Sequence, residues 1–489
     1  MRRVTAPLVW ALPAAVAAVL GGWRLTGAAL WADELATWGA VRLSWGRLWR
    51  LADAVDAVLT PYYAGLKAFA AIAGTGTAAL RLPSLLAMIA TTLAVVALGR
   101  RAGGDRTGLG AGLLFAILPV TSRYAQEARP YALAMLFAAL ALLALIRLLE
   151  RPTLARTAVY AGAVALTGLC HPLSGLLMVA GHALPGWRLP RRWPPAALAG
   201  SLPAVALCLM AAGQSAQLSW ITRVGEQTVR NVPKQLFLSA ALGGLILGLA
   251  ILGTRRTDET NTPGRLSPAI LGTRRTGETN TPGRPSPALC LAGAGFAPIV
   301  LLLAAGVFTP VWVARYVLIT VPALAVLAAW AAVRAGRAHL AAVVALAALL
   351  GHPVQRDIRE PAGHGQDSAR IAAVIRPLHR PGDVAVFPDS HPSIGWAPRD
   401  LYLRYLPAPR PPDVLATTGQ RLSGRLSARE CPEAACLGTP GRIWVIRVDS
   451  PADPLADMAP AKRDRIGDGY RVARRWSYPL LGITLLVRR

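Results

Sequence analysis

"RLPSLLAMIATTLAVVALGRRAGGDRTGLGAGLLFAILPV", residues 81–120, contains two long apolar runs separated by a short segment that carries three arginines. Each run approaches the roughly 20 apolar residues that a helix needs to cross a bilayer. The basic segment between the runs is typical of a cytoplasmic turn. The stretch therefore predicts a helical hairpin in a membrane, and the same pattern continues on both sides of it.

The whole chain has the composition of a polytopic membrane protein. Of its 489 residues, 54% are hydrophobic and 16% are charged, whereas soluble domains carry about 25% charged residues. The net charge of +27 comes mostly from arginines in short loops between apolar runs, so we attribute it to membrane orientation and expect no nucleic-acid partner. We expect about eleven transmembrane helices, near residues 7–23, 80–99, 107–122, 132–149, 157–170, 173–187, 196–213, 236–253, 287–307, 316–333 and 338–351.

Charge fixes the expected orientation of these spans. With a cytoplasmic N-terminus, all the inside loops are basic, whereas the short outside turns are nearly free of arginine. The C-terminus and the first outer loop, 24–79, then lie outside the cytoplasm. Within that loop, "WGAVRLSWGRLWRLADAV" and "PYYAGLKAFAAIAG" predict helices lying in the membrane interface, because neither segment is a comfortable span.

Two regions follow from this organisation. Residues 1–351 are expected to form the transmembrane domain, with a disordered cytoplasmic loop at 254–286 that contains most of a near-exact internal duplication. From 352 to 489, "GDVAVFPD", "GRIWVIRVDS" and "LGITLLVRR" predict strands of a small extracytoplasmic α/β domain. In that domain, Cys431 and Cys436 could pair in an oxidising compartment.

Several ionisable and aromatic residues gather at the expected outer face. Ionisable groups at membrane depth are costly and usually mark function or mutual pairing. They lie in "WADELATW", "VDAVLTPYY", "TSRYAQEARPYAL", "CHPLSG" and "TPVWVARYVL". The candidates are Asp33, Glu34, Asp56, Arg123, Glu127, Arg129, Tyr131, His171, Arg315 and Tyr316.

These residue types suit group transfer from a lipid-linked phosphate. A carboxylate can take the proton from an acceptor hydroxyl, and arginines can bind a phosphate leaving group. Nucleotide donors are absent outside the cytoplasm, so a lipid carrier is the natural donor. No metal-ligand spacing is present.

The motifs "WADELATW", "PYYAGLKAFAAIAGTGTAALRLPSLLA" and "SRYAQEARPYAL" resemble the GT-C membrane glycosyltransferases, and most closely the bacterial protein-mannosyltransferase-like proteins of family 39. The resemblance covers about 1–335 and is most specific over 31–133. It implies a cell-envelope enzyme of the cell membrane that moves a sugar, mannose by default, from polyprenyl phosphate to an extracytoplasmic protein, lipid or polysaccharide.

The resemblance also implies roles for particular residues. Asp33 matches the family's catalytic base, with Glu34 beside it, and transfer would proceed with inversion. The "QEARPY" block implies donor-phosphate or acceptor contacts, and the "PYY" segment, with Tyr62 and Tyr63, matches the family's juxtamembrane helix. Relatives often have a histidine before that proline-tyrosine run; here it is missing, so either its role is dispensable or His171 supplies it.

Three further questions stay open at this point. Metal dependence varies across the superfamily, so a divalent cation is possible. A polytopic transporter or lipid flippase is the alternative function, although the chain shows no inverted internal repeat. The missing histidine also leaves room for an inactive scaffold whose outer domain binds cell-wall polymer.

Overall fold

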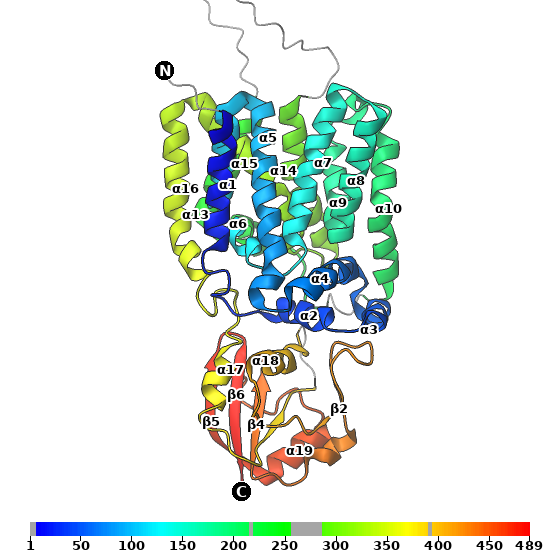
Figure 1. Cartoon of the computed structure of the whole chain (residues 1–489), viewed down its shortest axis with the longest axis vertical. Helices are drawn as coiled ribbons and strands as arrows, with labels where there is room; N and C mark the ends of the chain where they lie inside the picture. The colour runs from blue at the N-terminus through cyan, green and yellow to red at the C-terminus, as the bar shows by residue number, and fades with distance from the viewer. Residues whose placement is uncertain (1–5, 215–218, 256–285, 390–393) are drawn as a thin grey trace, which may run out of the picture.

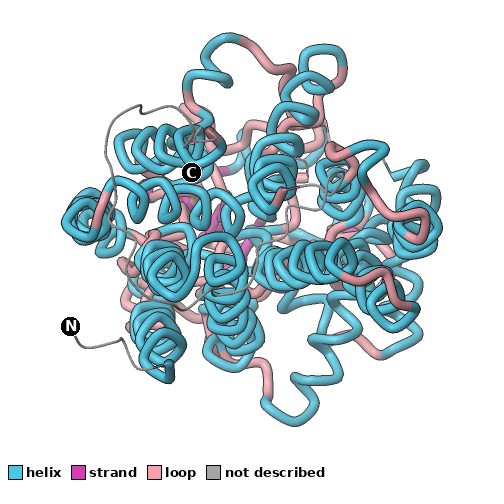
Figure 2. Tube along the Cα trace, turned by 90° about the horizontal axis from the view of Figure 1, so that it is seen from above, coloured by secondary structure: helices cyan, strands magenta, loops and turns pink. Residues whose placement is uncertain are grey.

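A computed structural model of the chain describes residues 6–214, 219–255, 286–389 and 394–489. A tall bundle of helices carries a small sheet domain at one end, and a layer of short helices lies between the two (Figure 1). Seen from above, the long helices of the bundle stand side by side, many of them nearly end-on (Figure 2). The mostly helical architecture with a small C-terminal sheet domain confirms the expected fold class.

The bundle is built from long apolar helices and short connecting ones. Its elements are α1 (Ala6–Gly22), α5 (Thr77–Ile117), α6 (Pro119–Ala125), α7 (Tyr131–Glu150), α8 (Leu154–Cys170), α9 (Pro172–His182), η3 (Gly186–Arg188), α10 (Trp193–Ala211), α11 (Glu226–Arg230), α12 (Val232–Phe237), α13 (Ala240–Thr254), α14 (Pro287–Phe308), η5 (Ala314–Thr320), α15 (Val321–Ala335) and α16 (Arg337–Asp357). Every expected span overlaps one of these helices.

The count of eleven membrane-crossing helices is not confirmed. Among the described residues, six helices are long and apolar enough to cross a membrane. One of the six is α5, which contains the expected span 80–99 and most of the expected span 107–122, joined at Gly103 and Gly104. Gly104 has a φ of 77°, a conformation that glycine adopts at no steric cost. Other expected spans correspond to shorter apolar helices, such as α8 and α13.

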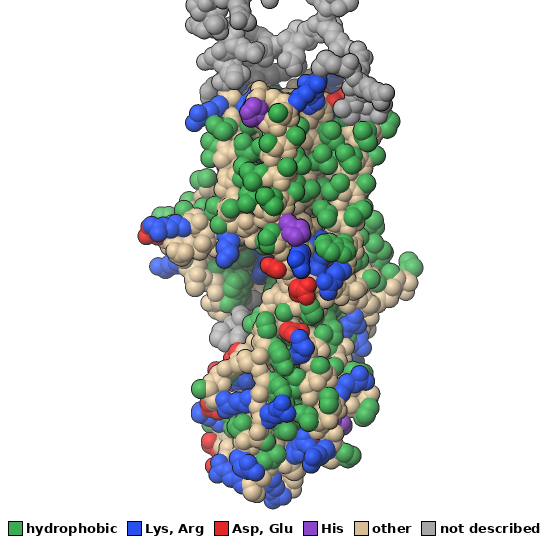
Figure 3. All heavy atoms as spheres, turned by 90° about the vertical axis from the view of Figure 1, so that its left-hand side faces the viewer, with side chains coloured by type: hydrophobic (Ala, Val, Ile, Leu, Met, Phe, Trp, Pro, Cys, Tyr) green, Lys and Arg blue, Asp and Glu red, His purple; other side chains and the backbone are tan. Residues whose placement is uncertain are grey.

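The basic turns gather at the end of the bundle away from the sheet domain. Arg101, in the turn of α5, pairs with Glu150 at the end of α7 at 3.5 Å. Arg334, at the end of α15, donates to the carbonyl of Leu252 near the end of α13 at 2.8 Å. On the face in Figure 3, apolar side chains dominate the helical part, whereas charged side chains are frequent on the sheet domain.

The first outer loop forms the layer between the bundle and the sheet domain. Its elements are α2 (Ala32–Val41), α3 (Trp45–Leu51), the π-helix η1 (Ala52–Asp56), the 3-10 helix η2 (Ala57–Leu59) and α4 (Thr60–Ala73). Helix α3 buries Leu48 and Leu51 and exposes Trp45 and Trp49. This division of apolar and exposed aromatic side chains is typical of a helix lying in the membrane interface.

The outer domain, from residue 358 on, is built around a four-stranded sheet. Its elements are α17 (Arg370–Ile375), β1 (Val384–Val386), α18 (Ala397–Tyr405), β2 (Ala416–Thr418), β3 (Arg429–Glu430), η6 (Pro432–Leu437), β4 (Arg442–Arg447), α19 (Pro460–Gly469), β5 (Tyr470–Tyr478) and β6 (Leu481–Arg488). The sheet order is β1-β4-β6-β5, with β1 parallel to β4 and the other pairs antiparallel. The sequence missed β5, an edge strand whose exposed arginines interrupt its apolar pattern.

The outer loop and the outer domain share one hydrophobic core. Leu35 and Tyr63 of the loop belong to the same buried cluster as Leu401 and Trp444 of the domain. Because one core joins the two regions, the outer domain is part of the structure that shapes the loop. The expected domain boundary at residue 351 falls inside α16.

Two sequence features need separate mention. Residues 256–285, which make up nearly all of the expected loop at 254–286, lie outside the described residues. Cys431 and Cys436 are free thiols, and the backbone N–H of Cys436 donates to the sulfur of Cys431 at 3.1 Å.

Candidate active site

Asp33 and Glu34 are adjacent in the first turn of α2, but their side chains enter different environments. The helix rotates by about 100° per residue, so neighbouring side chains diverge. Arg81 Nε and Nη2 donate to the two carboxylate oxygens of Glu34 at 2.8 and 2.7 Å, and both side chains are fully buried. The backbone N–H of Ala128 also donates to Glu34, at 2.8 Å.

Electrostatics keep the Glu34 carboxylate ionised. Burial alone would raise the pKa of Glu34, but Arg81 outweighs burial and holds that pKa well below its ordinary value. His364 lies 3.4 Å from the same carboxylate, and burial lowers the pKa of His364 to about 3. Glu34 therefore links the outer loop to α5 through a buried ion pair with Arg81, in which both carboxylate oxygens accept hydrogen bonds.

The Asp33 carboxylate faces two arginines without a hydrogen bond to either. Its Oδ2 atom lies 3.8 Å from Arg129 Nη2 and 3.6 Å from Arg315 Nη2. These separations exceed hydrogen-bond length, and Oδ2 is buried with no hydrogen-bond partner among the described residues. The Asp33 side chain is 15% exposed. It is thus a largely buried, ion-paired carboxylate whose Oδ2 atom makes no hydrogen bond within the described part of the chain.

Arg129 connects Asp33 to the second acid of the outer loop. Arg129 Nη1 lies 3.3 Å from the backbone carbonyl oxygen of Asp33 and 3.4 Å from both Thr37 Oγ1 and Tyr63 Oη. The Tyr63 hydroxyl donates to Asp56 Oδ2 at 3.1 Å. Burial raises the pKa of Asp56, against the opposing effects of Arg129 and Tyr63. The outer loop and the segment before α7 therefore meet through one polar chain.

Arg315, at the start of η5, lies among aromatic rings. Its guanidinium carbon is 5.8 Å from the ring centre of Trp31, 5.4 Å from that of Trp220 and 6.0 Å from that of Tyr131. The Arg315 side chain is 22% exposed, and its buried Nε has no hydrogen-bond partner among the described residues. Arg315 is therefore a cation held mainly by ring faces, with free donors.

His171 completes the aromatic wall where α8 breaks into α9. Its ring centre is 4.5 Å from that of Tyr316 and 5.8 Å from that of Tyr131. Its Nδ1 lies 2.8 Å from Ser174 Oγ, which donates to the backbone carbonyl of Tyr316 at 2.5 Å. The break at His171 thus places the imidazole beside η5 and the start of α7.

Arg123 and Glu127 form an ion pair behind this wall. Arg123 Nη1 donates to Glu127 Oε2, and the Arg123 guanidinium carbon lies 5.8 Å from the ring centre of Trp31. Burial raises the pKa of Glu127, against the opposing effect of Arg123. Tyr62 lies on α4 beside Tyr63, with ring centres 6.3 Å apart, and its buried hydroxyl has no hydrogen-bond partner among the described residues.

The structure thus brings most of the sequence candidates into one connected site. Ion pairs, hydrogen bonds and ring contacts connect Asp33, Asp56, Tyr63, Arg123, Glu127, Arg129, Tyr131, His171, Arg315 and Tyr316. Glu34 instead faces Arg81. Within the described residues, no group of three or more histidine, cysteine or acidic side chains is arranged to hold a metal ion.

Sequence reasoning missed the residues that support this site from outside the outer loop. Gln366 Oε1 accepts from the backbone N–H of Ala32 at 2.8 Å, and Ser368 Oγ donates to the carbonyl of Leu30 at 2.8 Å. The hydroxyl of Tyr405 accepts from the N–H of Leu30 at 2.7 Å. No local pattern marks these residues, because their partners lie more than 300 positions away in the chain.

Two other residues support the site, and one of them, Arg81, left a signal in the sequence. Arg81 stands at the start of an apolar run, where an ionisable residue suggests a buried partner. Gly39 lies on α2 against the outer domain: a Cβ atom there would be 2.4 Å from Arg421 Nη1. Glycine at position 39 therefore permits the close approach of Arg421, which is itself paired with Asp400 at 2.8 Å.

Comparisons with known proteins agree with this architecture. Residues 59–220, less than half of the chain, match the model of the dolichyl-phosphate-mannose-protein mannosyltransferase family. The crystal structure of ArnT from Cupriavidus metallidurans in the apo state is similar over 97% of both chains, with a TM-score of 0.59 and 14% identity. The structure of ArnT bound to undecaprenyl phosphate is similar over 98% of both chains, with a TM-score of 0.58 and 14% identity.

A comparison with curated protein sequences finds no match. At 14% identity, the structural similarity establishes a shared fold across nearly the whole chain, outer domain included. Together with the family match, it confirms the resemblance to the GT-C superfamily that the outer-loop motifs indicated.

Proposed function

Because the chain has the GT-C fold, we propose that it is a membrane glycosyltransferase that moves a sugar from a polyprenyl-phosphate carrier to an acceptor hydroxyl, with Asp33 as general base. One observation carries the proposal. The Asp33 carboxylate is held between Arg129 and Arg315 with an oxygen that has no hydrogen-bond partner among the described residues. A carboxylate base beside cations suited to phosphate is the arrangement that this transfer needs.

The two arginines take different parts in the proposed reaction. Arg129 contacts the backbone of Asp33 and the side chains of Thr37 and Tyr63, so it orients the base. Arg315 keeps its donors free and is partly exposed, so it binds the phosphate of the carrier. The crystal structure of ArnT with undecaprenyl phosphate supports a carrier of this class.

The proposed step is a direct displacement with inversion. Asp33 takes the proton of the acceptor hydroxyl while the hydroxyl oxygen forms a bond to the anomeric carbon of the sugar. The bond from that carbon to the phosphate oxygen breaks, and the electron pair leaves with the polyprenyl phosphate, whose charge Arg315 stabilises. Glu34, bound to Arg81 through both oxygens, positions α2 and does not take the proton.

The proposal includes an orientation and leaves a choice of sugar. The site lies at the end of the bundle away from the basic turns, so by the positive-inside rule it faces outward, with the N-terminus in the cytoplasm. The family match supports mannose as the first sugar to test, with arabinose and glucose as further candidates. Protein, lipid and polysaccharide all remain possible acceptors.

Replacing Arg315 by glutamine is expected to raise KM for the polyprenyl-phosphate sugar by about 10- to 100-fold. A hydrogen bond to a charged group is worth about 1.5–3 kcal/mol, and this variant removes the proposed phosphate ligand. Arg315→Lys keeps the positive charge but loses the planar guanidinium, so its KM should lie between those of the wild type and Arg315→Gln. The measurement is release of labelled sugar from the lipid fraction at varied donor concentration.

The matched control is Arg47→Gln, which removes an exposed arginine of the first outer loop. Its KM should equal that of the wild type. If Arg315→Gln also leaves KM unchanged, another group binds the phosphate and the role given to Arg315 is wrong.

Replacing Gln366 by methionine tests whether the outer domain positions the base. Methionine keeps the size of the side chain but removes the acceptor of the Ala32 N–H, and an unsatisfied buried donor costs about 1–3 kcal/mol. We expect kcat to fall by about 10-fold with KM for the donor unchanged, because the segment before Asp33 loses its anchor. The exposed Gln227→Met variant serves as the control, and equal kcat values in the two variants would exclude this positioning role.

A further inference from the structure

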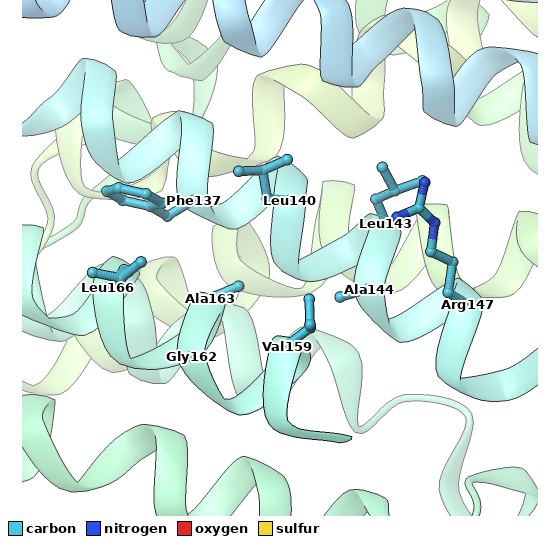
Figure 4. Close-up of a pocket in the computed structure, with 9 residues that line it drawn as sticks. All are labelled: Phe137, Leu140, Leu143, Ala144, Arg147, Val159, Gly162, Ala163 and Leu166. Carbon is cyan, nitrogen blue, oxygen red and sulfur yellow. The ribbon is translucent and has the colours of Figure 1, made fainter. Parts of the chain in front are cut away.

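A second site lies away from Asp33, in an apolar groove of about 330 Å³ between α7 and α8 (Figure 4). Its lining contains one charged side chain, that of Arg147 in the last turn of α7. The lining residues are Phe137, Leu140, Leu143, Ala144, Arg147, Val159, Gly162, Ala163 and Leu166.

Small residues create the hollow. Ala144 of α7 lies beside Val159 of α8, and Gly162 and Ala163 lie further along α8, toward the end where Phe137 and Leu166 stand (Figure 4). A Cβ atom added at Gly162 would meet no other atom within 4 Å. Small residues in membrane helices usually let two helices approach closely. Here they leave room for a further apolar group.

The aliphatic part of Arg147 lines the other end of the groove, and its guanidinium lies beyond that apolar lining. Glu150, one turn beyond Arg147, pairs with Arg101 at 3.5 Å and with Arg156 at 3.8 Å. Among the described residues no carboxylate lies within ion-pair distance of the Arg147 guanidinium, although its backbone carbonyl accepts from Arg156. Arg147 is therefore a free cation at the mouth of an apolar groove, close to the end of a membrane-spanning helix.

We propose that this groove is a binding site for one anionic phospholipid, with an acyl chain along α7 and α8 and the phosphate at Arg147. The apolar lining fits an acyl chain, and the free guanidinium complements an anionic headgroup at the level where headgroups lie. Basic pockets between membrane helices are known to bind anionic lipids in this way.

The position of Arg147 separates this site from that of the proposed sugar donor. Tyr131, in the wall of the active site, stands at the opposite end of the same helix. The sixteen residue steps from Tyr131 to Arg147 span about 24 Å at the rise of an α-helix. A phosphate bound at Arg147 therefore belongs to the opposite leaflet from a phosphate bound at Arg315.

Native mass spectrometry of the purified full chain tests the proposal by titration with phosphatidylglycerol and, separately, with phosphatidylcholine. We expect the wild type to hold one phosphatidylglycerol more tightly than phosphatidylcholine. Arg147→Gln should lower the affinity for phosphatidylglycerol about five-fold, which is the effect of one basic residue on the binding of an anionic lipid. Gly162→Leu should fill the groove and lower the affinity for both lipids.

Two matched controls separate this site from general lipid binding. Arg191→Gln removes an exposed arginine between α9 and α10, and Gly248→Leu adds the same side chain to an open position on α13. Both control variants should bind phosphatidylglycerol and phosphatidylcholine with the affinities of the wild type. Equal retention of the two lipids, or no effect of Arg147→Gln and Gly162→Leu, would overturn the proposal. Competition by undecaprenyl phosphate would also overturn it and assign the groove to the donor's tail.

Discussion

Replacing Asp33 by asparagine is expected to reduce kcat for sugar transfer by about 10²- to 10⁴-fold, the usual contribution of a general base. Asparagine has the same shape but cannot take the proton of the acceptor hydroxyl. KM for the polyprenyl-phosphate donor should change little, because Arg315 still binds the phosphate. The measurement is loss of labelled sugar from the lipid fraction of membranes that contain equal amounts of each protein.

Asp53→Asn is the control for this experiment, because Asp53 is an exposed acid of the same outer loop. It should transfer sugar at the wild-type rate. If Asp33→Asn retains full kcat, Asp33 is not the base. If the wild type releases no mannose, arabinose or glucose from any carrier lipid, the glycosyltransferase proposal itself fails, and transport or lipid flipping becomes the better explanation of the fold.

Replacing Glu34 by glutamine is expected to lower the free energy of unfolding by about 3–5 kcal/mol, because it leaves Arg81 as a buried charge without its partner. The loss should appear as a lower Tm in detergent. Transfer activity should fall with the folded fraction, because Glu34 holds α2 against α5 and the Ala128 segment. This dependence distinguishes Glu34 from Asp33, whose longer ion pairs with Arg129 and Arg315, at 3.8 and 3.6 Å, predict a smaller loss of Tm on replacement.

Two further variants test the explanation. Glu360→Gln breaks the exposed pair with Arg24, whose side chains are 60% and 47% exposed, and should cost no more than about 1 kcal/mol. The double variant Glu34→Gln/Arg81→Met removes both buried charges and should be less destabilised than the two single variants added together. A Glu34→Gln protein with the wild-type Tm would contradict the buried ion pair.

Residues of the outer domain hold the segment that carries Asp33. Gln366, Ser368 and Tyr405 bind the main chain at Leu30 and Ala32, immediately before Asp33. A shared hydrophobic core and the Arg421–Gly39 contact hold the same region from the side. The carboxylate of Asp33 is therefore positioned by residues from the far end of the chain, and removing the outer domain would expose this core.

The sequence by itself determined the features that depend on local pattern. Apolar runs of spanning length, with arginines in alternate loops, predicted the bundle, and the "WADELATW" and "QEARPY" motifs predicted the site residues that contact one another. Short apolar segments predicted β1, β4 and β6, whose residues are almost continuously buried. These features are readable because hydrophobic periodicity and chemical motifs belong to neighbouring residues.

Only the tertiary structure decided which of the two adjacent acids faces which partner. Local pattern does not distinguish Asp33 from Glu34, and only the family resemblance singled out Asp33. The rotation of α2 turns Glu34 to Arg81 and leaves Asp33 between Arg129 and Arg315. The supports of the site come from residues hundreds of positions away, and the groove at Arg147 comes from the packing of two helices. Such contacts depend on how distant segments pack, and a single sequence carries no local signal of that packing.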